Sequence, residues 1–281
     1  MHLFLLQLQS ELLKMFARKR TYIGFGAFLF VEILVLVLWQ LPGGQRWMRH
    51  MIERNGGVFD QYFSGLTLAV IMLAMTVFLL GALYLALVGG DVVAKEVEDG
   101  TMRMTLCRPV SRERVLLVKY GATVIYTFAL IFFIGLTALA TATMVRGNGG
   151  LFVVIPEEKL LALYDFRPGL LRYLAGLPCY ALSLLTISTL AFLLSCWNMK
   201  PATATITAIT VFFIDWICHF MPYFESYRPW MMTTHMTTWL NIFRSPIPWE
   251  KMAEDYAYLL AIDATLLIAG LAVFHRRDFK S

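Results

Sequence analysis

The sequence of 281 residues is 59% hydrophobic and only 15% charged. Soluble globular domains carry about 25% charged residues, so this composition excludes an ordinary soluble protein and indicates a chain that lies largely in lipid. The formal net charge of +5 fits cationic loops beside a membrane, and no basic run interleaved with aromatic residues indicates a nucleic-acid partner. The four cysteines form no C-x-x-C pair, so we expect neither a disulfide framework nor a metal site.

The first segment, residues 1–20, predicts an amphipathic helix that lies at a membrane surface. Its apolar residues recur at helical spacing and polar residues interrupt the run. The positive charges of this segment follow its apolar residues, whereas a signal peptide has its positive charges first. We therefore expect the segment to be retained.

Six apolar stretches follow, each long enough to cross a hydrocarbon core, which needs about 20 helical residues. We expect an all-α polytopic membrane protein with one transmembrane permease domain over 1–281. The spans are expected at about 22–41, 66–90, 115–145, 173–197, 202–224 and 256–274. The third stretch exceeds the bilayer thickness, so its first turns are expected to project and let Lys119 reach the lipid headgroups. Only 198–201 joins the fourth and fifth stretches, which predicts adjacent antiparallel helices.

The distribution of Lys and Arg predicts the orientation of the chain. Segments 1–21, 91–119, 198–201 and 275–281 hold 14 of the 24 Lys and Arg residues. The other loops are longer and hold 10. Because cytoplasmic loops carry the excess of positive charge, we expect a multi-pass protein of the cell (inner or plasma) membrane with both termini in the cytoplasm. On the opposite face, segment 146–172 is expected to lie as an amphipathic helix.

The charged segment 91–112, which we call the connector, is the most informative part of the chain. Gly100 interrupts it, so we expect two short helical pieces around a bend. Pro109 disfavours a helical Arg108, and Ser111 is suited to cap the third span. The connector carries charges of both signs with apolar residues between them. Two interpretations stay open: a docking surface for a partner, or a solvated turn whose charges only fix the orientation.

The connector resembles the cytoplasmic loop after the second span in permease subunits of type-2 ATP-binding-cassette (ABC) transporters. The shared pattern is G-x-x-x-x-x-E-x-E-D-G-T, then P-V-S-R about eight residues further and a Lys seven residues beyond. It falls on Gly90, Glu96, Glu98, Asp99, Gly100, Thr101, Pro109, Val110, Ser111, Arg112 and Lys119. The plan of the whole chain is also similar to that family, which has an amphipathic N-terminal helix, six spans and both ends inside.

The resemblance implies that the connector is a coupling helix seated in a groove of a separate ABC ATPase subunit. It also implies that this chain pairs with a second permease copy or a homologous permease around a translocation path that exports a substrate. The residues implied to couple are Glu96, Glu98, Asp99, Gly100, Thr101, Pro109, Ser111 and Arg112. The sequence contains no G-x-x-x-x-G-K-[ST] phosphate loop. We therefore expect the partner to bind ATP and Mg²⁺, with no cofactor and no enzyme activity in this chain.

Three acidic residues, Glu32, Asp215 and Asp263, fall inside the apolar stretches. A charge at the bilayer centre costs at least about 2.5 kcal/mol, so each is a candidate for a polar pathway or a cation site. Alternatively, each is protonated or bonded to hydroxyls of the bundle, such as the threonines in 203–210. If the three acids couple ion flow, the chain is an ion-coupled secondary transporter, although neither internal repeats nor broken helices are evident. An intramembrane enzyme is not favoured, since the sequence has no H-E-x-x-H motif.

Overall fold

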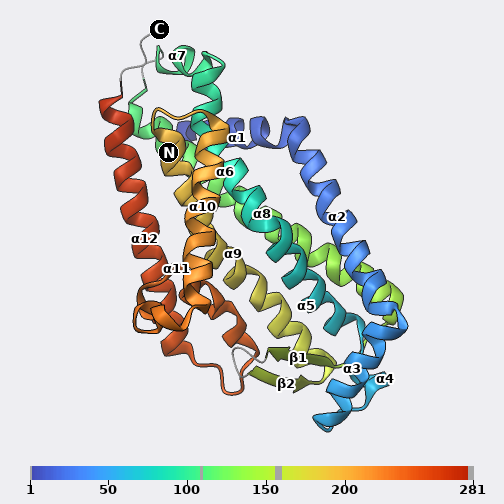
Figure 1. The fold of residues 1–281 in the computed structure, drawn as a ribbon. Coiled ribbons are helices and arrows are strands. Elements are labelled where there is room, and N and C mark those ends of the chain that lie inside the picture. The colour runs from blue at the N-terminus through green and yellow to red at the C-terminus, as the bar shows by residue number, and fades with distance from the viewer. Residues whose placement is uncertain (1, 108–109, 156–159, 278–281) are drawn as a thin grey trace.

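Long helices run side by side through most of the molecule (Figure 1). The computed structural model describes residues 2–107, 110–155 and 160–277. The first half of the chain forms α1 (His2–Ala17), α2 (Lys19–Gln40), α3 (Pro42–Arg54), α4 (Phe59–Tyr62), α5 (Gly65–Thr76), the π-helix η1 (Val77–Gly81), α6 (Ala82–Glu98), α7 (Thr101–Leu106) and α8 (Arg112–Arg146). The second half forms β1 (Leu151–Ile155), β2 (Leu160–Tyr164), α9 (Phe166–Cys196), α10 (Pro201–Phe220), the 3₁₀-helix η2 (Pro222–Trp230), α11 (Met232–Met236), the 3₁₀-helix η3 (Thr237–Phe243) and α12 (Trp249–Arg276).

Five of these helices, α2, α8, α9, α10 and α12, are long and apolar enough to cross a membrane. They coincide with five of the predicted stretches, so the prediction of a mostly helical, membrane-type chain is confirmed. The remaining stretch, 66–90, falls on α5, η1 and α6 in succession. Its backbone stays helical at both junctions, with φ −64° and ψ −44° at Thr76 and φ −61° and ψ −52° at Gly81. The run is therefore one helix that widens by a π-turn.

Helix α9 is the central element of the bundle. Of its most apolar window, 78% is buried, whereas the figure for α10 is 17%. Helices α6, α8, α10 and α12 all pack against α9. The contact between α9 and α10 confirms that the short 198–201 connection joins neighbouring antiparallel helices.

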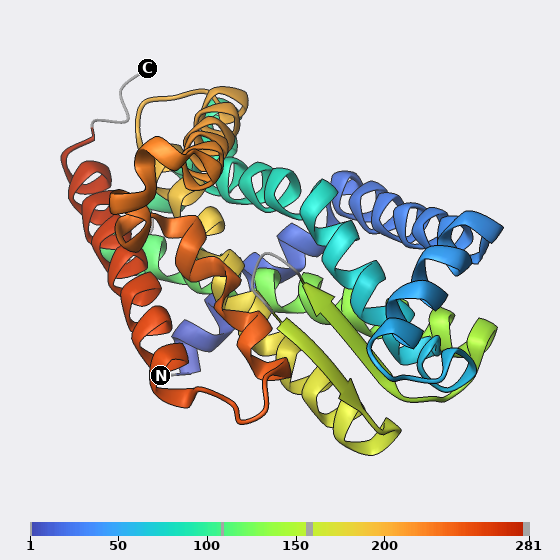
Figure 2. The same ribbon diagram turned by 60° about the horizontal axis from the view of Figure 1, so that its bottom comes forward.

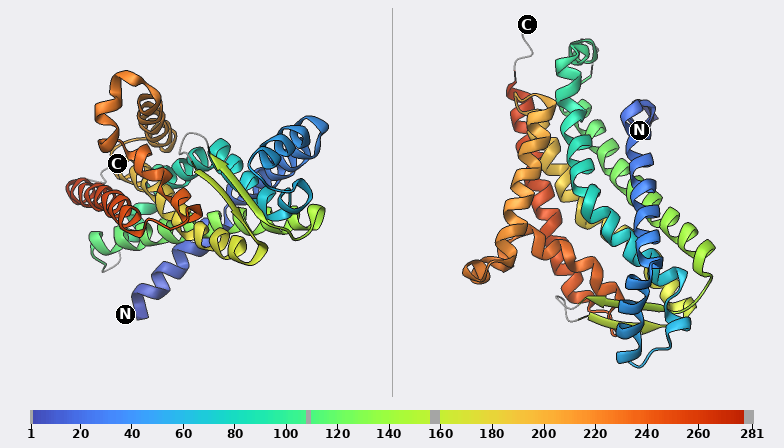
Figure 3. Two further views of the ribbon diagram at one scale, coloured as in Figure 1. Left: turned by 90° about the horizontal axis from the view of Figure 1, so that it is seen from below. Right: turned by 45° about the vertical axis from the view of Figure 1, so that its right-hand side comes forward.

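The loops gather at two opposite ends of the bundle. Helix α1, α7, the end of α12 and the turn from α9 to α10 lie at one end, which we call the α7 end (Figure 1). Helices α3 and α4 and the two strands lie at the other, which we call the hairpin end (Figure 3). The two sets of segments that were compared for their Lys and Arg residues therefore lie at opposite ends of the bundle, as far as the structure describes them.

The expected amphipathic helix within 146–172 is wrong, because the chain there forms an antiparallel β-hairpin. Leu151 pairs with Tyr164 and Ile155 with Leu160, and Figure 2 brings this hairpin forward. Strand β1 packs against α5 and α9, and its Phe152 N–H donates to Thr67 Oγ1 at 2.9 Å. This packing buries the apolar residues of β1, which a helix lying alone at the surface would leave more exposed.

Candidate functional site

The connector forms the predicted bend between two helices. Helix α6 continues past Gly90 and ends at Glu98, and α7 begins at Thr101. Between them Gly100 has φ +73°, and its N–H donates to the carbonyl of Val97 at 3.1 Å. A positive φ of this kind favours glycine, which ends the helix and reverses the chain. Pro109 and Arg108 lie outside the described residues.

The start of α8 is fixed by its own cap and by the end of α12. Ser111 Oγ accepts from the Arg114 N–H at 3.3 Å, which confirms the predicted N-cap. Arg112 Nη1 donates to the carbonyl oxygens of His275 at 3.1 Å and Arg277 at 2.9 Å. The guanidinium of Arg112 therefore holds the last turn of α12 against the beginning of α8.

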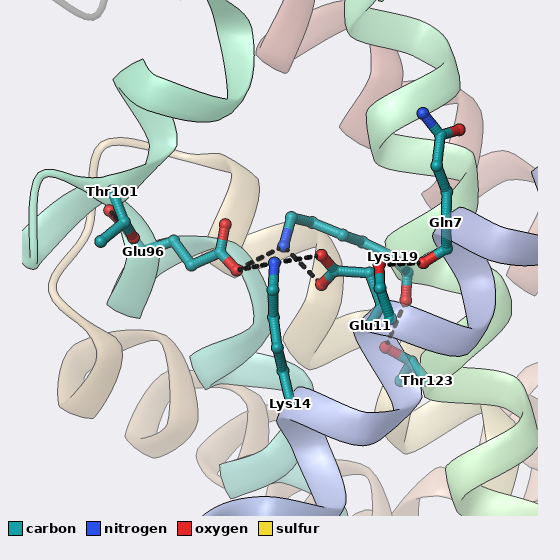
Figure 4. Close-up of polar contacts among 8 residues, drawn as sticks. Gln7, Glu11, Lys14, Glu96, Thr101, Lys119 and Thr123 are labelled. Atoms are coloured by element: carbon teal, nitrogen blue, oxygen red, sulfur yellow. Dashed lines mark hydrogen bonds and ion pairs between the residues drawn. The ribbon is translucent and has the colours of Figure 1, made fainter. Parts of the chain in front are cut away.

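Glu96 lies in the connector but its carboxylate turns into the protein. Its Oε1 is 2.8 Å from Lys119 Nζ and 3.7 Å from Lys14 Nζ. Lys119 Nζ also lies 2.9 Å from Glu11 Oε2, and Glu11 Oε1 is 2.6 Å from Lys14 Nζ. Figure 4 shows these four side chains meeting from α1, α6 and α8. We call Glu11, Lys14, Glu96 and Lys119 the charge cluster.

The prediction that Lys119 reaches the lipid headgroups is wrong. Its side chain is only 2% exposed, because α1 packs across α8 and covers it. Taking an ammonium out of water costs several kcal/mol unless carboxylates replace the lost hydration. Glu11 and Glu96 supply that replacement from two different helices, so the charge cluster ties α1, α6 and α8 together.

The charge cluster shifts the titration of its two members on α1. Burial alone raises the pKa of Glu11, but Lys119 and Lys14 together outweigh it and hold the pKa below the ordinary value of 4.5. Burial lowers the pKa of Lys14, but its bond to Glu11 and the charge of Glu96 outweigh that effect and raise the pKa above 10.5. Both shifts favour the charged forms of Glu11 and Lys14.

A Glu11→Gln variant is expected to be less stable than wild type at neutral pH and to lose that disadvantage in acid. A carboxyl with a lowered folded pKa stabilises the fold above its unfolded pKa, and this contribution disappears as the pH falls through the folded pKa. The difference in melting temperature should be constant above about pH 6 and shrink below about pH 4.5. Thermal unfolding in detergent from about pH 3 to about pH 8 measures it, with Glu254→Gln at an exposed position as control. A difference that persists unchanged to the lowest pH would contradict the role given to Glu11.

The outward side of the connector is formed by the residues that follow Glu96. Glu98 Oε2 and Asp99 Oδ1 lie 2.8 and 3.3 Å from Lys95 Nζ, and both carboxylates are exposed. Met104 on α7 is 68% exposed. Thr101 Oγ1 donates to the Glu96 carbonyl at 3.3 Å and closes the bend. The outward side of the connector thus carries two exposed carboxylates, both paired with Lys95, beside an exposed apolar side chain.

A groove of about 420 Å³ lies beside this surface, between α1, α7 and the start of α8. The polar residues on its walls come from α1 and α7, and its apolar residues come from α7 and from the chain that leads into and forms α8. They are Gln7, Ser10, Glu11, Lys14, Thr101, Met104, Val110, Val115 and Val118. One signal in the sequence indicates the part played by α1. Glu11 and Lys14, three residues apart, interrupt an apolar helix and so share a face.

Glu32 makes its hydrogen bond with the third long helix of the bundle. Its side chain is fully buried in α2, and Thr137 Oγ1 on α8 donates to Oε1 at 3.0 Å. The bond supports the interpretation that Glu32 is bonded to a hydroxyl of the bundle. The hydroxyl is that of Thr137 and not of a threonine in 203–210. The other oxygen, Oε2, is buried and has no hydrogen-bond partner among the described residues.

Asp215 and Asp263 lie in different settings. Asp215 Oδ2 accepts from the Thr233 N–H at 2.7 Å and so caps α11. Asp263 is 3% exposed, and both of its carboxyl oxygens are buried with no hydrogen-bond partner in the described part of the chain. The hydroxyls of Thr186 and Thr189 on α9 are close enough to interact with it without reaching hydrogen-bond geometry. The three acids therefore belong to separate local environments.

Two polar groups at the hairpin end were not singled out as a pair from the sequence. His235 Nδ1 lies 2.7 Å from Asp255 Oδ1, and Thr238 Oγ1 donates to Asp255 Oδ2 at 2.8 Å. These bonds join α11 and η3 to α12. Among the residues that the structure describes, no group of three or more His, Cys, Asp or Glu side chains is arranged to hold a metal ion.

Comparison with known proteins gave one family. Residues 66–280, more than half of the chain, match the family described as "Protein of unknown function (DUF2705)". The matched region begins with α5 and includes the connector, α8 and the helices after it. No curated protein matches the sequence.

Proposed function

The chain belongs to the DUF2705 family of proteins of unknown function, and from its geometry we propose that it is the membrane-spanning permease subunit of an ATP-driven exporter of the type-2 ABC class. In this proposal α2, the α5–η1–α6 run, α8, α9, α10 and α12 are six spans. A separate ATPase subunit binds ATP and Mg²⁺. A second permease copy or a homologous permease completes the path for an exported substrate.

The observation that supports the proposal is the way the connector is attached to the helix bundle. Its outer side offers Glu98 and Asp99, while its inner side is joined through Glu96 and Lys119 to α8 and α1. A displacement applied to the bend at Gly100 would reach several helices at once, because the links are short ion pairs between packed elements. A loosely attached loop would absorb the same displacement.

The orientation follows from the α7 end. The described residues of segments 1–21, 91–119, 198–201 and 275–281 lie at that end. In the sequence these segments hold 14 of the 24 Lys and Arg residues. Positive charge is retained on the cytoplasmic side, so the connector faces the cytoplasm, where ATP is available, and the hairpin end faces outward. The membrane is the cell membrane, inner or plasma.

Glu98→Lys combined with Asp99→Lys is expected to abolish binding of the ATPase subunit or to uncouple ATP hydrolysis from transport by about tenfold or more. Reversing two exposed charges turns attraction into repulsion across a small interface. The measurement is co-purification with a P-loop ATPase, sought among the reading frames beside the gene, followed by ATPase assays of the reconstituted complex. Glu96→Lys is a poor probe, since it would place a third ammonium against Lys119 and Lys14.

The matched control is Glu225→Lys at the hairpin end. Glu225 is exposed and pairs with a cation three residues away in the chain, Arg228, just as Glu98 pairs with Lys95. This variant should bind and stimulate the ATPase like wild type. Unchanged association and coupling in the double variant, or labelling of a cysteine at Asp99 only from outside intact cells, would overturn the proposal.

The alternative, an ion-coupled secondary transporter that uses Glu32, Asp215 and Asp263, is supported most by Asp263. Both oxygens of that carboxyl are buried without a hydrogen-bond partner among the described residues, whereas Glu32 lacks one only at Oε2. Glu32 and Asp215 accept hydrogen bonds from α8 and α11. Transport by the purified chain under an imposed proton gradient, lost in Asp263→Asn, would favour this alternative over the exporter.

A further inference from the structure

An apolar groove of about 380 Å³ lies between α2 and the η1–α6 segment, toward the α7 end. Small-ligand sites in proteins have volumes of about 300–1,000 Å³. The apolar walls of the groove include Ile23, Ala27, Phe28, Leu80, Leu83 and Leu87. Ile23 is 71% exposed and Leu83 is 49% exposed, so the groove opens to the outside of the bundle. On a membrane-spanning chain that outside is lipid.

The floor of the groove is closely packed. The rings of Phe28 and Tyr84 meet edge to face with centroids 5.3 Å apart. Gly24 lies against the Tyr84 ring so closely that a Cβ there would have no room. Tyr84 Oη is in turn hydrogen bonded to Tyr126 Oη at 3.0 Å. The groove is therefore a formed feature between two helices that touch at its base.

The mouth of the groove carries more positive charge than its acidic neighbours neutralise. Arg20 lines the groove and its Nη1 lies 2.7 Å from Asp91 Oδ2. A small adjoining pocket shares Arg20 with the groove and is also lined by Arg18. In the part of the chain that the structure describes, Arg18 and its neighbour Lys19 have no ion-pair partner. Two cations are thus left over at the corner between α1 and α2.

The nearby acids are already engaged by other groups. Glu11 and Glu96 belong to the charge cluster, where Lys14 and Lys119 balance them. Asp91 is bonded to Arg20. An anion that reached this corner would therefore meet the cations at Arg18 and Lys19 without first displacing a carboxylate.

We propose that this groove binds an anionic phospholipid of the leaflet at the α7 end, with an acyl chain along α2 and α6 and the phosphate beside Arg18 and Lys19. Basic pockets between transmembrane helices are suited to anionic headgroups. The surface helix α1 leads directly into this corner and so sets it at headgroup depth. A second copy of the chain that presented the same corner would place its own Arg18 and Lys19 near those of the first copy. The repulsion between these cations makes a second copy a less favourable occupant of the groove than an anionic lipid. The proposal rests on the membrane location and does not depend on the ABC assignment.

The test uses the purified full chain in nanodiscs that contain either phosphatidylglycerol or phosphatidylcholine with identical acyl chains. Native mass spectrometry after detergent release counts the lipid that stays bound. Wild type is expected to retain about tenfold or more phosphatidylglycerol than phosphatidylcholine, because two cations near a membrane surface attract the anionic headgroup. Arg18→Gln with Lys19→Gln should reduce this preference to about twofold or less. The control Arg54→Gln with Lys251→Gln removes two exposed cations from the hairpin end and should leave the preference intact.

A second pair of variants tests the groove itself. Ala27→Leu fills the groove, while Gly26→Leu places the same side chain on α2 at a position where a Cβ meets nothing within 4 Å. Only Ala27→Leu should lose the bound phospholipid. Equal retention of the two lipids by wild type, or loss of lipid in neither variant, overturns the proposal. Dissociation of a dimer by Ala27→Leu with lipid retention unchanged overturns it in favour of a second copy as occupant. None of these outcomes involves the ATPase, so they leave the proposed function untouched.

Discussion

Replacing Lys119 by Met is expected to lower the free energy of unfolding by about 3–5 kcal/mol. The substitution keeps most of the side-chain volume but removes the ammonium that lies 2.9 Å from Glu11 and 2.8 Å from Glu96. Two carboxylates, 13% and 9% exposed, then share Lys14 alone, which is 2.6 Å from Glu11 and 3.7 Å from Glu96. Removing one partner from a buried ionic group is costly for this reason, even where the intact group adds little net stability.

The measurement is reversible unfolding in mixed micelles or the shift of the melting temperature in detergent. Lys95→Met is the matched control, because Lys95 also pairs with two carboxylates but is 32% exposed and contacts them on the surface. Exposed pairs contribute about 0–1 kcal/mol. Adding Glu11→Gln to Lys119→Met should restore part of the loss, since it removes one uncompensated charge. A loss no larger than that of Lys95→Met would show that the charge cluster does not hold α1 to the bundle.

Replacing Gly89 by Ala is expected to destabilise the packing of α6 against α9 by about 1–3 kcal/mol. A Cβ at this position would lie 2.6 Å from the carbonyl oxygen of Ser188 and 3.0 Å from Ala191 Cβ. The first of these atoms belongs to the backbone of the central helix, so relief requires the two helices to move apart. The shift would occur in α6 just before the connector begins at Asp91, where the proposed coupling movement would pass.

Gly26→Ala provides the control for the change of residue type. Gly26 is an exposed helical position on α2, and a Cβ there meets nothing within 4 Å. Alanine is favoured over glycine inside a helix by about 0.5–1 kcal/mol, so this variant should be neutral or slightly more stable. Equal melting temperatures for the two variants would mean that α6 and α9 are not packed as closely as the structure has them.

The structure gives a physical reason for part of the connector pattern. Glu96 and Lys119, 23 residues apart in the pattern, form one buried ion pair. Glu98 and Asp99, two and three residues after Glu96, are exposed. The pattern therefore combines residues that fix the connector to the bundle with residues that face outward. We expect the first kind to govern stability and the second kind to govern partner binding.

The long helices and the bend at Gly100 could be predicted from the sequence because both are local properties. A helix satisfies its backbone groups within one segment, which is the requirement that lipid imposes, so apolar length alone located α2, α8, α9, α10 and α12. The positive φ at Gly100 and the cap at Ser111 likewise depend on the residue itself and its immediate neighbours.

The contacts between distant segments were decided only by the tertiary structure. Lys119 turned inward because α1 covers α8 and supplies Glu11. Residues 151–155 and 160–164 form paired strands because α5 and α9 offer β1 a buried surface. Asp215 caps a helix that begins 17 residues later in the chain. Sequence periodicity states which face of an element is apolar or charged, but not which other element will lie against that face. The energy of a buried charge or an unpaired strand depends on that neighbour, so these features needed the fold.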